Sequence, residues 1–506
     1  MAAVAHGHVS MSAIRKSIAF SMVDRYLSQI LLIATTATMS RLLTPAETGL
    51  YLTANALILL IDNFRTFGVT IYIVQEKDLT REMVRSAFTI ILILSMALGA
   101  AVCLTSNFVA AFYGTPELET LLVVSAFGFL GLPISGPIMG LLQRDMAFKA
   151  IAGINIASGL AGLVVTITLG FRGFGPVSYV WGFVTASFAL SALALVARPV
   201  FWIFRPSFAC IRQLLSFGAA SSLITVSNMA YDFLPRLAFG KLLGFDAVAI
   251  YSRAVTVCQL PDRAVVSALH PVVLPALAAH RRAGGSVKEG YLHGLGLIAA
   301  VQWPALIMLA LLADPVVHVL LGSQWGAVPP LVRLMAIGNM ALAPAVLTLP
   351  VLVSTGRIRS AVLSSLISLP LSFVIAFAAA FYFGLEAVAA SLLVIAPLQT
   401  AIAYAFVRAA IGVGWGDLAA VARQSACLAL GTALAPLAIV AASPTGFDLG
   451  WFQTLAVIAG GALGWLAAVF VIDHPLKREL AGVRVFLQTL PYGDVRLRPL
   501  AAWRSR

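Results

Sequence analysis

The 506-residue sequence has few charged residues: Asp, Glu, Lys and Arg together make up 10% of it, whereas hydrophobic residues make up 60%. A soluble globular protein carries about 25% charged residues. The scarcity of charge, with apolar runs long enough to cross a bilayer, excludes an ordinary soluble protein. It predicts an all-α chain that crosses a membrane many times.

Cysteine is also scarce, and its placement excludes two kinds of site. The four cysteines are Cys103, Cys210, Cys258 and Cys427, too far apart for a metal-binding motif or a disulfide framework. The seven histidines likewise lack metal-ligand spacing. No nucleophile–base pattern stands out, and no loop on the predicted outer side is long enough for a catalytic domain. We therefore predict a transporter without metal or cofactor, not an enzyme.

Fourteen segments are long and apolar enough to be predicted as transmembrane helices. They cover residues 17–40, 48–74, 86–112, 118–141, 150–171, 176–197, 213–239, 247–270, 291–313, 328–353, 360–382, 386–408, 420–442 and 450–472. An even number of spans places both termini on the same side of the membrane.

The distribution of Lys and Arg predicts which side that is. Of the 33 Lys and Arg residues, 24 fall in the termini and the alternate loops, and 3 fall in the other loops. Positive charge concentrates on the cytoplasmic side, so both termini are predicted to be cytoplasmic. The net charge of +13 is then a topology signal with some attraction to anionic membrane lipids, and nucleic-acid binding is not needed to explain it.

An internal repeat divides the chain into two halves. The segment RLLTPAETGLY at 41–51 aligns with KLLGFDAVAIY at 241–251, and the same offset aligns Asp62 with Asp262. YGTPELETLL at 113–122 then aligns with LGSQWGAVPPLV at 321–332. We predict six-helix bundles at 1–205 and 206–412, related as parallel repeats, an extra helix pair at 413–473, and a basic cytoplasmic tail at 474–506.

Charged residues inside the predicted spans are the main functional signal. Apart from Arg333, they fall on the first two spans of each half: Arg25, Arg65, Arg236, Arg253, Arg263, Asp24, Asp62, Asp232 and Asp262. Exposing all ten to lipid would cost roughly 30 kcal/mol. On several of these spans the charged residues recur with Ser, Thr and Asn at helical spacing, which predicts a polar cleft between the two bundles.

An arginine-rich cleft suits a phosphate or diphosphate, because guanidinium groups stay charged and bind phosphate oxygens bidentately. The aspartates are candidates for coupling transport to a proton or Na⁺ gradient. Two alternatives stay open. The pairs Asp62–Arg65 and Asp232–Arg236 are spaced as ion pairs that would only help helices pack, and Asp24 and Arg253 lie near enough to span ends to snorkel.

Several motifs together resemble one family. SRLLTPAETGLY, QRDMAFK, YGTPEL, LGSQWGAVPPLVRLMA and FGPVSYVWG are similar to the polysaccharide exporters of the multidrug/oligosaccharidyl-lipid/polysaccharide (MOP) superfamily, and more narrowly to Wzx-type flippases. The resemblance covers about residues 15–410.

The resemblance implies a bacterial inner-membrane protein that flips an undecaprenyl-diphosphate-linked oligosaccharide towards the periplasm for lipopolysaccharide or exopolysaccharide synthesis. It implies that Arg25, Arg65 and Arg253 hold the diphosphate, with a polymerase and a chain-length regulator as candidate partners. A MATE-type multidrug antiporter and a membrane glycan polymerase or ligase are the alternatives. The first would favour an acidic cleft, and the second a large periplasmic loop.

Overall fold

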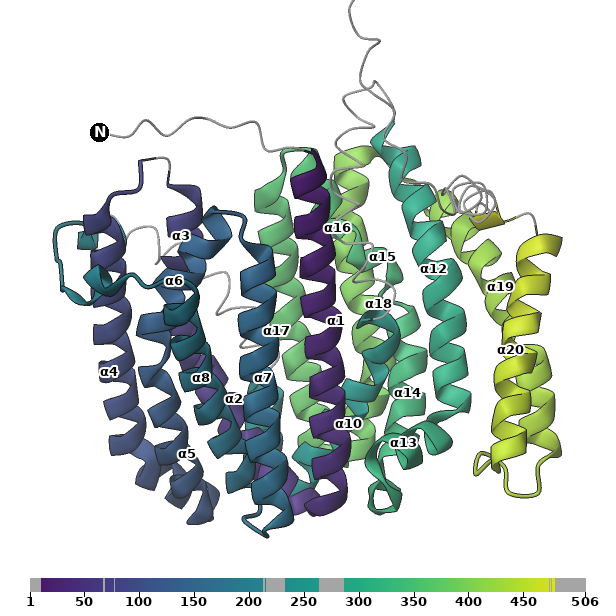
Figure 1. Ribbon diagram of the computed structural model, residues 1–506. Coiled ribbons are helices and arrows are strands. Elements are labelled where there is room, and N and C mark those ends of the chain that lie inside the picture. The colour runs from purple at the N-terminus through teal and green to yellow at the C-terminus, as the bar shows by residue number, and fades with distance from the viewer. Residues whose placement is uncertain are drawn as a thin grey trace, which may run out of the picture. The chain divides into compact units, whose positions relative to one another are not determined.

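The computed structural model describes residues 11–66, 69–76, 78–212, 214, 233–263, 286–472, 474 and 476–477. Within these residues the chain is helical and contains no strand, as the composition predicts (Figure 1). The helices are α1 (Met11–Leu42), α2 (Pro45–Thr66), α3 (Val69–Gln75), α4 (Arg81–Tyr113), α5 (Glu117–Phe127), η1 (Gly128–Leu130), α6 (Leu132–Arg144), α7 (Phe148–Phe171), α8 (Val177–Ala197), η2 (Phe201–Phe204), α10 (Phe245–Cys258), α12 (Val287–Leu311), α13 (Ala313–Leu321), η4 (Ser323–Trp325), α14 (Val328–Met340), α15 (Ala343–Val346), α16 (Thr348–Ser354), α17 (Ile358–Phe383), α18 (Leu385–Ile411), α19 (Trp415–Ala442) and α20 (Trp451–Val471).

Eight helices of the described chain are long and apolar enough to cross a membrane, so the protein is a multi-pass membrane protein. They are α4, α7, α8, α12, α17, α18, α19 and α20. Each coincides with a predicted span to within a few residues. The count rises to ten when two bent helix pairs are each taken as one span. The total of fourteen spans stays a prediction.

The two bent pairs differ from the straight spans predicted at 118–141 and 328–353. The first pair bends by 45° between Leu130 and Leu132, and the second bends by 63° between Met340 and Ala343. Pro133 and Pro344 each stand in the first two positions of the helix that follows the break. Proline is favoured there because its missing N–H would have no partner within the helix.

The described helices form two compact units. Unit 1 combines Met1–Val257 with Ala313–Met335 and Ile367–Ile395, and unit 2 combines Cys258–Leu312 with Ala336–Leu366 and Ala396–Arg506. Each unit therefore contains segments that are distant in the sequence. The six-helix halves predicted from the repeat stay a prediction.

Local sequence signals explain where key helices begin and end. Thr44 and Glu47 form a capping box at the start of α2: the Thr44 N–H donates to Glu47 Oε2 at 2.8 Å, and the Glu47 N–H donates to Thr44 Oγ1 at 3.3 Å. Pro45 follows as the first helical residue. Gly114 ends α4 with a φ of 73°, a left-handed conformation that favours glycine.

Small residues bring the helices of unit 1 close together. α7 packs against both α1 and α8, as Figure 1 shows. A Cβ atom on Gly162 of α7 would lie 2.9 Å from the carbonyl oxygen of Gly182 of α8. Small residues at such crossings let membrane helices pack backbone to backbone, where dispersion takes the place of the hydrophobic effect.

Arginines of unit 1 bind backbone carbonyl groups and a carboxylate near helix ends. Arg85 Nε donates to the Arg205 carbonyl oxygen at 2.7 Å. Arg144 Nη1 donates to the Ile73 carbonyl oxygen at 3.0 Å, and Arg198 pairs with Asp145. All three arginines belong to the loops predicted as cytoplasmic, so residues that carry the topology signal also stabilise the ends of helices.

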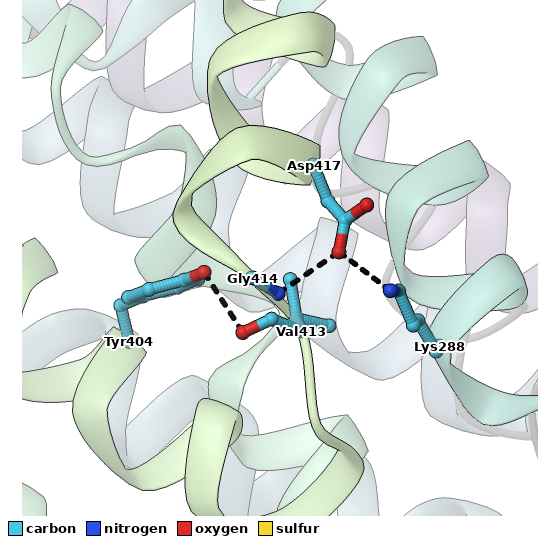
Figure 2. A network of polar contacts seen from close by, with 5 residues as sticks. All are labelled: Lys288, Tyr404, Val413, Gly414 and Asp417. Atoms are coloured by element: carbon cyan, nitrogen blue, oxygen red, sulfur yellow. Dashed lines mark hydrogen bonds and ion pairs between the residues drawn. The ribbon is translucent and has the colours of Figure 1, made fainter.

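Unit 2 places α19 against both α12 and α20. A Cβ on Gly464 of α20 would lie 2.4 Å from the carbonyl oxygen of Gly431 in α19. A polar network, shown in Figure 2, holds the start of α19: Asp417 accepts from the Gly414 N–H at 2.9 Å and pairs with Lys288 at 2.6 Å. The Tyr404 hydroxyl donates to the Val413 carbonyl oxygen at 3.1 Å. α19 is thereby joined to both α12 and α18.

Candidate functional site

Arg253 of α10 is the most buried of the predicted site arginines in the described chain, with 6% of its surface exposed. Its guanidinium carbon lies 5.5 Å from the centre of the Trp325 ring. Its Nη2 donates to the Tyr179 hydroxyl at 3.4 Å. A cation over an aromatic face is worth roughly 0.5–2 kcal/mol, more when water is excluded. The aromatic side chains therefore hold this arginine inside unit 1.

The aromatic contacts extend one residue further. The ring of Tyr179 stacks on that of Tyr51, with centroids 4.1 Å apart and planes 7° from parallel. Two stacked tyrosines cannot reorient separately, so Tyr179 is a fixed partner for the arginine. The Nε atom of Arg253 is buried and has no hydrogen-bond partner among the described residues. A buried charged donor in this state favours an added acceptor, because leaving such a group unsatisfied costs roughly 1–3 kcal/mol.

Asp24 of α1 lies in a second polar group of unit 1. Its Oδ2 accepts from Asn155 Nδ2 of α7 at 2.9 Å, and its Oδ1 is 3.4 Å from the Ser28 hydroxyl. These contacts join α1 to α7 through oxygen-rich side chains. The carboxylate is half-buried, and both of these partners are uncharged.

Asp262 and Arg263 are adjacent residues of unit 2, and each forms a hydrogen bond with a glutamine side chain. Gln302 Nε2 of α12 donates to Asp262 Oδ1 at 2.7 Å, and Arg263 Nη2 donates to Gln259 Oε1 at 2.8 Å. Gln302 is 3% exposed. A buried glutamine that donates to a carboxylate fixes the position of the carboxylate without neutralising its charge.

The remaining predicted residues are distributed as follows. Arg25 is exposed on α1 and Asp62 is half-buried on α2, and Arg236 lies 5.6 Å from the Phe233 ring. The side chain of Arg65 and the whole of Asp232 lie outside the described residues. The two candidate ion pairs that include them, Asp62–Arg65 and Asp232–Arg236, therefore stay predictions.

Arg333, the one charged residue predicted inside a span outside the cleft helices, pairs with Asp314 of α13. Each partner is less than a third exposed. The pair stabilises the turn between α13 and α14. An ion pair of this kind offsets the cost of placing a charged arginine within an apolar helix.

The sequence interpretation missed the uncharged partners. Asn155, Gln302, Tyr179 and Trp325 lie outside the polar stripes that the sequence predicts on the first two spans of each half, so the sequence alone did not single them out. An isolated amide in an apolar helix is a usable signal, since an unpaired amide is costly in lipid. Among the described residues no group of three or more His, Cys, Asp or Glu could hold a metal ion.

The apolar helices and the close helix crossings define a polytopic, all-helical membrane protein. The chain belongs to the family of polysaccharide biosynthesis proteins, whose family model matches residues 38–330.

Several curated relatives are similar to this chain. The succinoglycan biosynthesis transport protein ExoT of Rhizobium meliloti is 24% identical over 69% of this chain and 71% of its own length. The lipopolysaccharide biosynthesis protein WzxC of Escherichia coli is 22% identical over 59% of this chain and 61% of its own length. The teichuronic acid biosynthesis protein TuaB of Bacillus subtilis is 23% identical over 54% of this chain and 56% of its own length. The matched region thus spans less than two thirds of WzxC and TuaB.

Solved structures share the fold at low sequence identity. The lipid II flippase MurJ in its inward closed conformation matches with a TM-score of 0.71 and 13% identity, over 92% of this chain and 100% of that chain. An inward-facing MATE transporter of the MOP superfamily matches with a TM-score of 0.61 and 16% identity, over 78% of this chain and 98% of that chain. The all-α fold is therefore that of MOP-superfamily transporters.

Proposed function

We propose that this protein is a flippase that moves undecaprenyl-diphosphate-linked oligosaccharide repeat units across the bacterial inner membrane for lipopolysaccharide or exopolysaccharide synthesis. The observation that carries the proposal is the buried Arg253, whose Nε–H has no partner among the described residues. A diphosphate supplies several acceptor oxygens and matches the planar guanidinium donor. Family membership supports polysaccharide precursors as the cargo.

The route follows from the predicted orientation. With both termini cytoplasmic, the oligosaccharide and diphosphate enter from the cytoplasm and the prenyl chain stays in the lipid. Alternating access then exposes the sugar on the periplasmic side. Arg25, Arg65, Arg236 and Arg263 are the other candidates for contact with the diphosphate or the sugars.

The aspartates are proposed to couple transport to an ion gradient. Asp262, held by Gln302, and Asp24, held by Asn155, are half-buried carboxylates with uncharged partners. Asp62 and Asp232 are the candidates outside these two contacts. Protonation or Na⁺ binding at such a carboxylate changes the local charge by one unit, which is sufficient to bias a conformational equilibrium.

A complementation experiment tests the proposed role of the arginines. In a strain that lacks the gene, Arg25→Gln should reduce surface polysaccharide at least tenfold if this exposed arginine contacts the diphosphate. Arg172→Gln is the matched control, because Arg172 is an exposed arginine in a predicted outer loop. Both proteins must reach wild-type membrane levels. A wild-type amount of surface polysaccharide in the Arg25→Gln strain would show that Arg25 does not contact the diphosphate.

A MATE-type antiporter is the rival function, since the fold is shared with MATE transporters. The excess of arginine over aspartate among the candidate residues favours an anionic cargo. Expression in a drug-sensitive strain separates the two: the proposal predicts no change in resistance to cationic drugs. A gain of resistance would favour the antiporter.

A further inference from the structure

Two basic side chains of unit 1 each reach from one predicted half of the sequence to a helix end of the other. Arg41, at the end of α1, donates from Nη2 to the carbonyl oxygen of Val319 in α13 at 2.7 Å. Lys241, at the end of the helical segment 233–242, donates from Nζ to the carbonyl oxygen of Phe112 in α4. Its Nζ also lies 4.7 Å from the centre of the Phe112 ring.

These two contacts are equivalent by the internal repeat. Arg41 and Lys241 occupy the same position of the aligned segments 41–51 and 241–251. Their acceptors lie one residue apart in the alignment of 113–122 with 321–332, because Phe112 aligns with Leu320 and Val319 precedes Leu320. Each acceptor is followed closely by an aligned glycine with positive φ: Gly114 at 73° and Gly322 at 103°. The same device is therefore built twice, with the two halves exchanging donor and acceptor.

A second contact accompanies each cation. On the Arg41 side, Trp325 Nε1 donates to the Ser40 carbonyl oxygen at 2.7 Å, and Gln324 Nε2 donates to that of Leu43 at 2.9 Å. On the Lys241 side, the Tyr113 hydroxyl donates to the Leu237 carbonyl oxygen at 3.0 Å. In each contact a side chain donates to a backbone carbonyl: those of Ser40 and Leu43 are at the end of α1, and that of Leu237 is within the helical segment 233–242. Figure 1 shows the end of α1 beside α13 at the lower end of unit 1.

Two glycines of unit 1 also allow close helix packing near the segments that carry the two cations. A Cβ on Gly49 of α2 would lie 1.8 Å from the carbonyl oxygen of Phe245 at the start of α10. Gly240 faces Thr53 of α2 in the same way, since its Cβ would lie 3.3 Å from the Thr53 hydroxyl. Thr53 is fully buried. α2 is thus tightly packed against the start of α10 and against the helical segment 233–242.

We infer that Arg41–Val319 and Lys241–Phe112 are paired latches that hold the extracytoplasmic end of the transport path closed and release together when it opens outward. The assignment of this end to the extracytoplasmic side rests on the orientation in the proposed function, which places both cations among the three in the outer loops. Whatever the cargo, the two latches then set the balance between the closed and the outward-open states.

The chemistry of the latches suits repeated opening. Both cations are exposed, so each can exchange its carbonyl acceptor for water at small net cost. A buried ion pair would resist opening far more strongly, because separating its members leaves uncompensated charges. The acceptors are main-chain atoms, so no side-chain protonation is needed for release.

Thiol labelling of a buried position beneath the latches measures opening directly. In a chain with its four cysteines replaced, Thr53→Cys is exposed to a membrane-impermeant maleimide in right-side-out membrane vesicles. Arg41→Gln combined with Lys241→Gln should raise the labelling rate about tenfold, and each single change about threefold if the two contribute independently. The single variants decide the matter if the double variant does not accumulate.

Three controls make the result specific. Arg172→Gln removes an exposed arginine from the same predicted side and should leave the rate unchanged. Arg41→Lys with Lys241→Arg keeps a cationic donor at each position and should restore a rate close to that of the parent. In inside-out vesicles the double variant should show no increase. Equal rates for the double variant and the parent, or an equal increase from both faces, would overturn the latch.

The labelling assay needs neither cargo nor polymer. Failure of the proposed cargo would leave the labelling result intact, and a latch that does not respond would leave the polysaccharide phenotype of other variants unaffected.

Discussion

Trp325 contacts Arg253 and the end of α1 at the same time. Its ring centre lies 5.5 Å from the Arg253 guanidinium carbon, and its indole N–H donates to the Ser40 carbonyl oxygen at 2.7 Å. Trp325 itself is 1% exposed. The Trp325 side chain therefore joins the candidate anion-binding arginine to the latch on the Arg41 side. A movement of Arg253 would displace the end of α1, and a movement of α1 would displace Arg253.

Arg253→Lys tests whether the planar guanidinium is needed. Lysine keeps the charge but loses the fork of donors and the stacking on the indole. We expect surface polysaccharide to fall about tenfold while membrane levels stay near those of the wild type. The matched change Arg333→Lys keeps the charge opposite Asp314 and should leave export within about twofold. Equal export by both variants would contradict a binding role for Arg253.

Trp325→Phe tests the link between the arginine and the latch. The substitution removes the donor to Ser40 and weakens the cation–π contact, and it should increase labelling of Thr53→Cys by about threefold to tenfold. Trp303→Phe is the control, because Trp303 Nε1 also donates to a carbonyl oxygen, that of Met340 at 2.8 Å, within unit 2. An equal increase in labelling from both changes would mean that the loss of any indole hydrogen bond raises the labelling rate, and would contradict a specific link through Trp325.

The sequence predicted α7 and α8 closely because each is an uninterrupted apolar run. The predicted spans 150–171 and 176–197 end within two residues of Phe148–Phe171 and Val177–Ala197. The aligned segments 41–51 and 241–251 likewise show in the sequence that Arg41 and Lys241 occupy equivalent positions. Features that depend on residues close together in the sequence, such as an apolar run, could therefore be predicted.

The break within the predicted span 118–141 could not be predicted from neighbouring residues. It depends on α8, where Ser187 Oγ donates to the Gly128 carbonyl oxygen and Ser191 Oγ donates to that of Gly131, both at 2.7 Å. These hydroxyls add a second donor to two carbonyls at the bend that already accept backbone N–H groups, those of Gly131 and Ser135. The partners of Arg253 were missed for the same reason, since Tyr179 and Trp325 meet it only through tertiary packing.

Gly49→Ala tests the close approach of α2 to α10. The new Cβ would fall 1.8 Å from the Phe245 carbonyl oxygen, so the two backbones must separate. Overpacking of this kind costs about 1–3 kcal/mol, and the midpoint of thermal unfolding in detergent should fall by several degrees. Gly153→Ala in α7 is the control, because a Cβ there meets nothing within 4 Å. That change should be neutral or raise the midpoint slightly. Equal midpoints for the two variants would contradict the tight crossing.

His474, just beyond the end of α20, should make stability depend on pH. Burial, with a smaller contribution from His293, holds the pKa of His474 below its usual 6.5. The unfolded chain therefore takes up the proton first as the pH falls through about 6.5, and the free energy of unfolding decreases below that pH. The midpoint of thermal unfolding should fall less between pH 7.5 and pH 5.5 in His474→Gln than in the wild type. His318→Gln, at an exposed histidine, should behave as the wild type. A fall in the midpoint as large in His474→Gln as in the wild type would contradict the prediction.

The membrane face on which the lipid-linked oligosaccharide resides after removal of the protein tests the proposed flippase most directly. If the protein is the proposed flippase, its depletion in growing cells should make the undecaprenyl-diphosphate oligosaccharide accumulate on the cytoplasmic face. There it is protected in right-side-out vesicles from a glycosidase added outside and becomes cleavable after detergent is added. Accumulation in a form that the external glycosidase cleaves without detergent, or continued polymer synthesis with no accumulation, would contradict the account.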